Sequence, residues 1–203
     1  IGEEGFSGPV NDTNGMIWVI DPIDGTLNFV KQKNNFGIMI GLFNNGKPVA
    51  GYIYDVMQLD LYYGIVGEGM YLNNKLLKPL PVGPLNDSLI MGNVGMFSRN
   101  QNNCQSLLAT VLGARAHGSA ALEVIQVLRG EASLYLSFGL HPWDFAAGYA
   151  ICEAGGIICT QADGSPLSIL EKSPVLFAHP SVYKEAVEIL NNPTEIGEIN
   201  EYA

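Results

Sequence analysis

A short apolar run that ends in two acidic residues places the strongest constraint on how this chain folds. Residues 16–20 form a β-rich stretch, and Asp21 and Asp24 follow it directly in the string Asp-Pro-Ile-Asp-Gly-Thr. A buried carboxylate without a partner is destabilising by several kcal/mol or takes up a proton instead. Positive charge is therefore needed beside these acids, and a divalent metal ion is the simplest source. The alternative is a solvated turn, because Asp, Pro and Gly all favour turns.

The composition indicates a folded, acidic domain. Of the 203 residues 47% are hydrophobic, and the net charge is −10. A surface this acidic disfavours binding to nucleic acid and to anionic membranes, and we therefore expect neither as a partner. The three cysteines lack metal-like spacing and read as reduced thiols, which favours a cytoplasmic location. Because the chain starts at Ile1 inside a polar run, we expect a natural N-terminal portion to be missing.

Turn signals divide the first part of the chain into successive antiparallel strands. Asn44-Asn45-Gly46-Lys47 is a strong hairpin signal. The predicted strands of this sheet cover residues 16–20, 36–43, 49–54 and 59–66. Residues 78–84 carry three prolines and mark the expected boundary between two lobes. We therefore expect lobes 1–84 and 85–203, which together form one catalytic unit.

Strands and helices alternate beyond that boundary. Strands are predicted at residues 89–93, 134–137 and 157–160, and helices at 103–112, 120–128, 144–154 and 181–190. The helix at 120–128 is apolar almost all round, so we expect it to be buried with Gly130 at its C-terminal end. Ser181 is the expected N-cap of the last helix.

Three further segments could carry chemistry, and each has a plain structural alternative. The pair Glu3-Glu4 is typical of a solvated face. Asp144 follows His141-Pro142, where it would cap a helix or point a carboxylate at a metal held by Asp21 and Asp24. The small residues 118–121 either allow close packing or expose N–H groups and a hydroxyl to a ligand.

These motifs together resemble the inositol monophosphatase family of metal-dependent, lithium-sensitive phosphatases. The resemblance rests on Glu3-Glu4, the string 21–26, Gly118-Ser119-Ala120-Ala121, Trp143-Asp144-Phe145-Ala146-Ala147-Gly148 and Glu153-Ala154-Gly155-Gly156, in that order. It implies an α+β, layered α-β-α-β-α fold whose N-terminal helices are missing here, and a homodimer. The family also has an aspartate before the Glu-Glu motif that supports the catalytic threonine. Because that segment is absent, we expect the chain as it stands to have an incomplete site.

The resemblance also implies a role for each matching position. The implied catalytic residues are Glu3, Asp21 and Thr26. The implied metal ligands are Glu3, Asp21, the Ile23 carbonyl, Asp24 and Asp144. The implied substrate-binding residues are Asp24, Gly25, Thr26, Gly118, Ser119, Ala120 and Asp144. The implied cofactor is Mg²⁺, as two or three ions, with Mn²⁺ as a substitute and Li⁺ as an inhibitor. A metal-activated water would attack the phosphorus without a covalent intermediate.

The substrate is less constrained than the reaction. Inositol 1-phosphate is the implied substrate, and NADP, 3′-phosphoadenosine 5′-phosphate and sugar phosphates are alternatives. Inositol-specific members use a glutamate on the strand before the Trp-Asp motif, whereas Ser137 stands there in this chain. A regulatory or binding protein that keeps the phosphatase fold is the alternative outside enzymes. A haloacid-dehalogenase-type phosphatase is disfavoured, because two residues rather than one separate Asp21 from Asp24.

Overall fold

A six-stranded antiparallel sheet forms the first layer of the fold. The computed structural model describes residues 1–5 and 10–192. The strands pair in chain order and comprise β1 (Met16–Asp24), β2 (Gly37–Asn44), β3 (Lys47–Asp55), β4 (Asp60–Ile65), β5 (Gly69–Leu72) and β6 (Lys75–Leu76). The predicted meander is therefore confirmed. Strand β1 is longer than predicted, because it includes both acids of the Asp-Pro-Ile-Asp string instead of ending before them.

A second, five-stranded sheet follows in the order β10-β11-β9-β7-β8. Its strands are β7 (Leu89–Gly92), β8 (Gly113–Arg115), β9 (Leu134–Leu140), β10 (Ile158–Thr160) and β11 (Ser173–Ala178). Strand β7 runs parallel to β8 and β9, while β11 is antiparallel to β9 and β10. The first sheet ends before residues 78–84, at Leu76, and the second begins after them, at Leu89. The division of the chain into lobes 1–84 and 85–203 stays a prediction.

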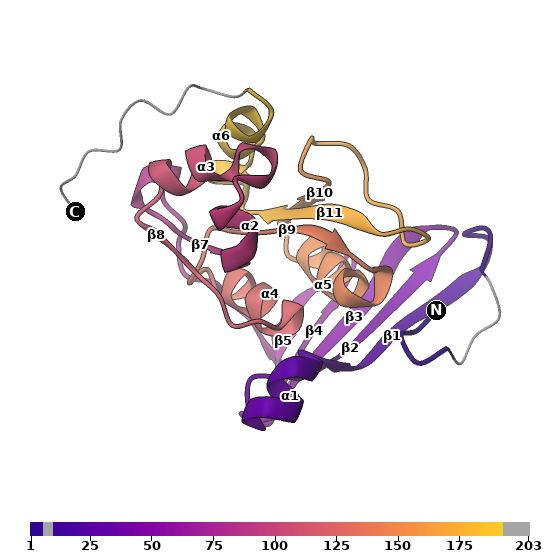
Figure 1. The fold of residues 1–203 in the computed structure, drawn as a ribbon. Helices are drawn as coiled ribbons and strands as arrows, with labels where there is room; N and C mark the ends of the chain where they lie inside the picture. The colour runs from indigo at the N-terminus through magenta and orange to yellow at the C-terminus, as the bar shows by residue number, and fades with distance from the viewer. Residues whose placement is uncertain (6–9, 193–203) are drawn as a thin grey trace.

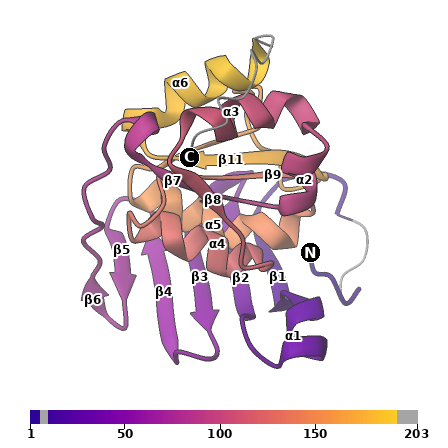
Figure 2. The same cartoon turned by 60° about the vertical axis from the view of Figure 1, so that its left-hand side comes forward.

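Helices fill the space between the sheets and cover the far side of the second one (Figure 1 and Figure 2). Helices α4 (Ala120–Leu128) and α5 (Pro142–Ala154) lie between the sheets, in a core with the inward side chains of both. Helices α2 (Val94–Ser98), α3 (Cys104–Thr110) and α6 (Pro180–Asn191) pack on the opposite face of the second sheet, around a separate core. This sheet–helix–sheet–helix order confirms the layered α+β fold. No described helix is both long and apolar enough to cross a bilayer.

Several helix boundaries differ from the predictions. The expected N-cap Ser181 is wrong, because α6 begins at Pro180 and His179 is its N-cap. Proline fits the first helical position, where no N–H partner is needed. Helix α5 likewise begins at Pro142 rather than Asp144, and α3 is shorter than the predicted 103–112. Gly130 follows α4 with a φ of 72°, as expected for a C-terminal glycine.

A row of glycines lets α5 lie unusually close to the first sheet. Gly41, Gly51 and Gly64 are neighbours in register on β2, β3 and β4. A Cβ atom on Gly51 would lie only 2.2 Å from the carbonyl oxygen of Ala147. Any side chain at this position would therefore push the helix away from the sheet. The glycine row fixes α5, and with it Asp144 in the first turn, relative to the end of β1.

Candidate active site

A bulge in β1 turns Asp21 and Asp24 toward the same side of the sheet. Successive side chains of a regular strand alternate, so residues three apart face opposite sides. Here Asp21 pairs with Met39 and Asp24 with Gly37, so β1 has one residue more than β2 over this stretch. The extra residue in β1 turns the Asp24 side chain to the same inward face of the sheet as that of Asp21. Both carboxylates are consequently buried, with exposed fractions of 2% and 6%.

Asp144 of α5 completes a cluster of three carboxylates. One oxygen from each of Asp21, Asp24 and Asp144 lies within 4.8 Å of the others. The only ion pair within residues 1–5 and 10–192 joins Arg129 to Glu131, so no Lys or Arg there is paired with the cluster. Asp144 also caps its own helix, because its Oδ2 accepts a hydrogen bond from the His141 N–H at 2.8 Å. The capping and metal-binding interpretations are thus compatible.

The ionisation of this cluster is suppressed in the absence of a cation. Burial, and then the charge of Asp24, raises the pKa of Asp21 from 3.8 to about 7. Burial raises the pKa of Asp24 to about 6, although hydrogen bonds from Ser119 and Ala121 act in the opposite direction. Burial also raises the pKa of Asp144. Three hard oxygen ligands without an ion-paired Lys or Arg among the described residues suit Mg²⁺, which would displace the protons.

The residues after Asp24 form a tight corner. Gly25 has a φ of 84°, and a Cβ atom there would lie 3.0 Å from that of Ser119. Thr26 then begins the short helix α1 (Thr26–Gln32), a position that the sequence left open as the start of a helix or a turn. The Thr26 hydroxyl donates to the Ile23 carbonyl oxygen at 3.0 Å. That carbonyl has a second lone pair, so its predicted role as a metal ligand stays open.

The start of α4 holds Asp24 in place. The Ser119 hydroxyl and the Ala121 N–H both donate to Asp24 Oδ2, the latter at 2.8 Å. The Ala120 N–H donates to Oδ1 at 3.2 Å. An acidic group is favourable at a helix N-terminus, where backbone N–H groups lack partners. The segment 118–121 therefore positions Asp24, in addition to lining the pocket described next.

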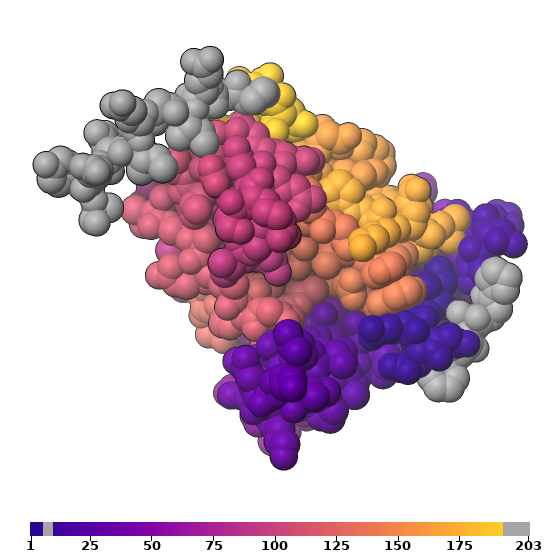
Figure 3. All heavy atoms as spheres, viewed as in Figure 1, coloured from indigo at the N-terminus to yellow at the C-terminus, as the bar shows by residue number. Residues whose placement is uncertain are grey.

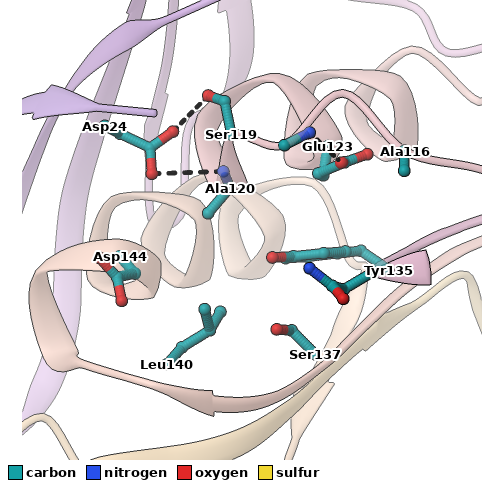
Figure 4. A pocket seen from close by; sticks show the side chains of 11 residues that line it. Asp24, Ala116, Ser119, Ala120, Glu123, Tyr135, Ser137, Leu140 and Asp144 are labelled. Atoms are coloured by element: carbon teal, nitrogen blue, oxygen red, sulfur yellow. Dashed lines mark hydrogen bonds between the residues drawn. The ribbon is translucent and has the colours of Figure 1, made fainter. Parts of the chain in front are cut away.

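A pocket of about 250 Å³ opens beside two of the three acids. Its wall includes Asp24 and Asp144 together with the predicted substrate-binding residues Gly118, Ser119 and Ala120. Figure 4 shows Asp24 and Asp144 toward one end, and Glu123, Tyr135 and Ser137 toward the other. The segments that supply these residues adjoin one another in the space-filling view (Figure 3). Two metal-binding candidates at one end, and hydroxyl groups with a single further acid at the other, suit a ligand with a phosphate and an alcohol portion.

Glu3 and Glu4 lie outside the cluster. Gly2 forms a bridge with Ile20, which places the first residues beside β1. Both glutamates are exposed and line a separate, mainly apolar groove with Trp18 and Ile20. The charge of Glu3 nevertheless contributes to the raised pKa of Asp21. The predicted role of Glu3 as a metal ligand and water activator stays a prediction.

The sequence interpretation missed Glu123 and Tyr135. Glu123 is 4% exposed on the buried helix α4, and Tyr135 is equally buried on β9. A single carboxylate in a helix that is otherwise apolar except for Gln126 was the available signal for Glu123. Burial raises the pKa of Glu123 to about 7, although hydrogen bonds from the Gly118 and His117 N–H groups act to lower it. No comparable sequence signal marked Tyr135, because an aromatic residue in a strand is ordinary.

Comparison with known proteins finds similarity to one family over nearly the whole described chain. The model of the inositol monophosphatase family matches residues 1–194. An inositol-1-monophosphatase of Bacillus subtilis is 39% identical over 192 residues, which cover 93% of this chain and 72% of that protein. The crystal structure of inositol monophosphatase-II from Staphylococcus aureus superposes with a TM-score of 0.89 at 38% identity, over 95% of this chain and 76% of the other. A structure of an IMPase/NADP phosphatase complexed with Mg²⁺ and phosphate gives 0.85 at 29% identity, over 95% and 73%.

Proposed function

The chain belongs to the inositol monophosphatase family, and on this premise we propose that it hydrolyses a small phosphate monoester with Mg²⁺ as cofactor. The observation that carries the proposal is the cluster of Asp21, Asp24 and Asp144, two of which line one end of a pocket. Inositol 1-phosphate is the proposed substrate. Homodimer formation and a cytoplasmic location stay predictions.

The three carboxylates would hold the metal, and Glu3 and the Ile23 carbonyl are the further proposed ligands. Bound Mg²⁺ would neutralise phosphate charge and lower the pKa of a coordinated water. Asp24 is held rigidly for this role by the donors at the start of α4. Asp144 is held by the His141 N–H and by the packing of α5 on the glycine row.

The residues after Asp24 would bind the phosphate and orient its attacker. Thr26 is the first residue of α1, so its N–H has no partner within the helix. The left-handed Gly25 brings this backbone close to the cluster without a side chain in between. We propose that the Gly25 and Thr26 backbone contacts a phosphate oxygen and that the Thr26 hydroxyl orients the water.

A phosphate-release panel tests the proposal. The substrates are inositol 1-phosphate, a sugar phosphate, NADP and 3′-phosphoadenosine 5′-phosphate, each assayed with Mg²⁺, with Mg²⁺ plus Li⁺, and with EDTA. We expect release that requires Mg²⁺ and falls on addition of Li⁺, with a preference for inositol 1-phosphate. The matched variant Asp144→Asn should be inactive under the same conditions. Absence of release from every ester would favour the binding-protein alternative.

A further inference from the structure

We propose that Glu123 is a specificity-determining residue whose free carboxylate oxygen, with Tyr135 and Ser137, binds a hydroxyl of a neutral polyol substrate. The inference rests on the proposed function, because it concerns the alcohol portion of the same phosphate ester. It assigns the substrate-binding carboxylate to α4, whereas the strand position where inositol-specific relatives carry a glutamate holds only Ser137.

The two oxygens of Glu123 are used unequally. Oε1 accepts hydrogen bonds from the His117 N–H at 2.6 Å and from the Gly118 N–H at 3.0 Å. Oε2 is buried, and no group in residues 1–5 or 10–192 donates to it. A buried polar atom without a hydrogen-bond partner is destabilising, and more so if it is charged. Holding the loop at 117–118 requires one acceptor only, so the loop does not explain the second oxygen.

The position of Glu123 in the pocket offers an explanation. It lies four residues after Ser119, which donates to Asp24, so the two are one helical turn apart. One turn rises about 5 Å, which is similar to the separation of two oxygens carried by opposite carbons of a six-membered ring. A ring whose phosphate lies near Asp24 and Asp144 would therefore present a hydroxyl to the Glu123 end (Figure 4).

The surrounding wall favours a neutral, hydroxyl-bearing ligand. Tyr135 and Ser137 add two hydroxyl groups to this end of the pocket. Burial raises the pKa of Tyr135 most, and the charge of Glu123 raises it next, as expected for close neighbours. None of the described residues that line the pocket is Lys or Arg. A second phosphate would meet uncompensated negative charge here, whereas a hydroxyl can both donate and accept.

The variant Glu123→Gln separates this role from a structural one. It keeps the carbonyl oxygen that can accept from His117 and Gly118, and it replaces the free oxygen by a donor. The matched control Glu185→Gln makes the same change at an exposed position of α6. Rates are measured with Mg²⁺ on inositol 1-phosphate and on phenyl phosphate, whose leaving group carries no further hydroxyl.

We expect Glu123→Gln to lower kcat/KM for inositol 1-phosphate by at least about tenfold and to change that for phenyl phosphate less than about threefold. The control should change neither. Equal losses on both esters, or no loss on either, would overturn the inference while leaving the phosphatase proposal intact. Failure to hydrolyse any ester would instead count against the phosphatase proposal itself.

A binding measurement decides the question without turnover. Calorimetric titration of inositol 1-phosphate in Ca²⁺ should show affinity at least about tenfold weaker for Glu123→Gln than for the unmodified chain. The melting temperature of the variant should be equal or higher, because a buried acid becomes neutral. Unchanged affinity, or no binding by the unmodified chain, would overturn the inference.

Discussion

The substitution Asp21→Asn should separate stability from catalysis, because the Asp21 carboxylate supports catalysis but destabilises the metal-free chain. Its oxygen Oδ1 accepts the Ile23 N–H at 2.9 Å, and an asparagine oxygen can accept the same bond. The variant therefore removes charge with little change in shape. We expect Mg²⁺-dependent phosphate release to fall by at least about 100-fold, since even indirect supports of a metal typically contribute 10–100-fold.

The metal-free variant should at the same time be more stable. A rise in the Asp21 pKa from 3.8 to about 7 corresponds to at most about 4 kcal/mol at 1.36 kcal/mol per pH unit. The buried amide also loses hydration, so we expect a net gain of about 1–2 kcal/mol, or about 2–8 °C in melting temperature. The assay is thermal unfolding in EDTA at pH 8.

The dependence of this gain on pH provides the control. Because the folded-state pKa exceeds the unfolded one, the folded chain binds more protons between about pH 4 and 7. Stability of the unmodified chain therefore falls as the pH rises through this window, and the advantage of Asp21→Asn disappears near pH 4. A variant that is less stable in EDTA at pH 8, or an advantage independent of pH, would refute the reasoning.

Three further changes test other parts of the site. Mg²⁺ should raise the melting temperature more at pH 7.5 than at pH 5.5, since protons compete with the metal for Asp21 and Asp24. Ser119→Ala should raise the Mg²⁺ concentration for half-maximal activity several-fold, because Asp24 loses a donor; an unchanged requirement would contradict this. Gly51→Ala should lower the free energy of unfolding in urea by about 2–3 kcal/mol, because its Cβ would clash with Ala147. Gly67→Ala is the control for backbone strain alone, because its Cβ would have no atom within 4 Å.

The strands and helices with clear patterns were predictable from local sequence. The meander of the first sheet followed from turn residues such as Asn45-Gly46, and α4 followed from its apolar run. Strand β11 was missed, because Pro174 near its start is unfavourable in a strand. Helix α1 was not predicted as an element, because the sequence left open whether Thr26 begins a helix or a turn.

The arrangement of the site depended on contacts that no local pattern contains. The residue types of Asp21, Asp24 and Asp144 pointed to a metal, but the bulge in β1 arises from register with β2. The position of α5 depends on glycines that become neighbours only when β2, β3 and β4 pair. The free oxygen of Glu123 is likewise a property of the folded pocket, since any donor brought close by the fold would have satisfied it.

Diffraction from crystals soaked in Mn²⁺ tests the central claim most directly, because the anomalous signal locates the ion independently of activity. The account predicts a peak within bonding distance, about 2.0–2.3 Å, of carboxylate oxygens from Asp21 and at least one of Asp24 and Asp144. The peak at Asp21 should disappear in Asp21→Asn crystals soaked in the same way. Anomalous peaks only at surface carboxylates, with the three acids still in contact and no ion between them, would contradict the account.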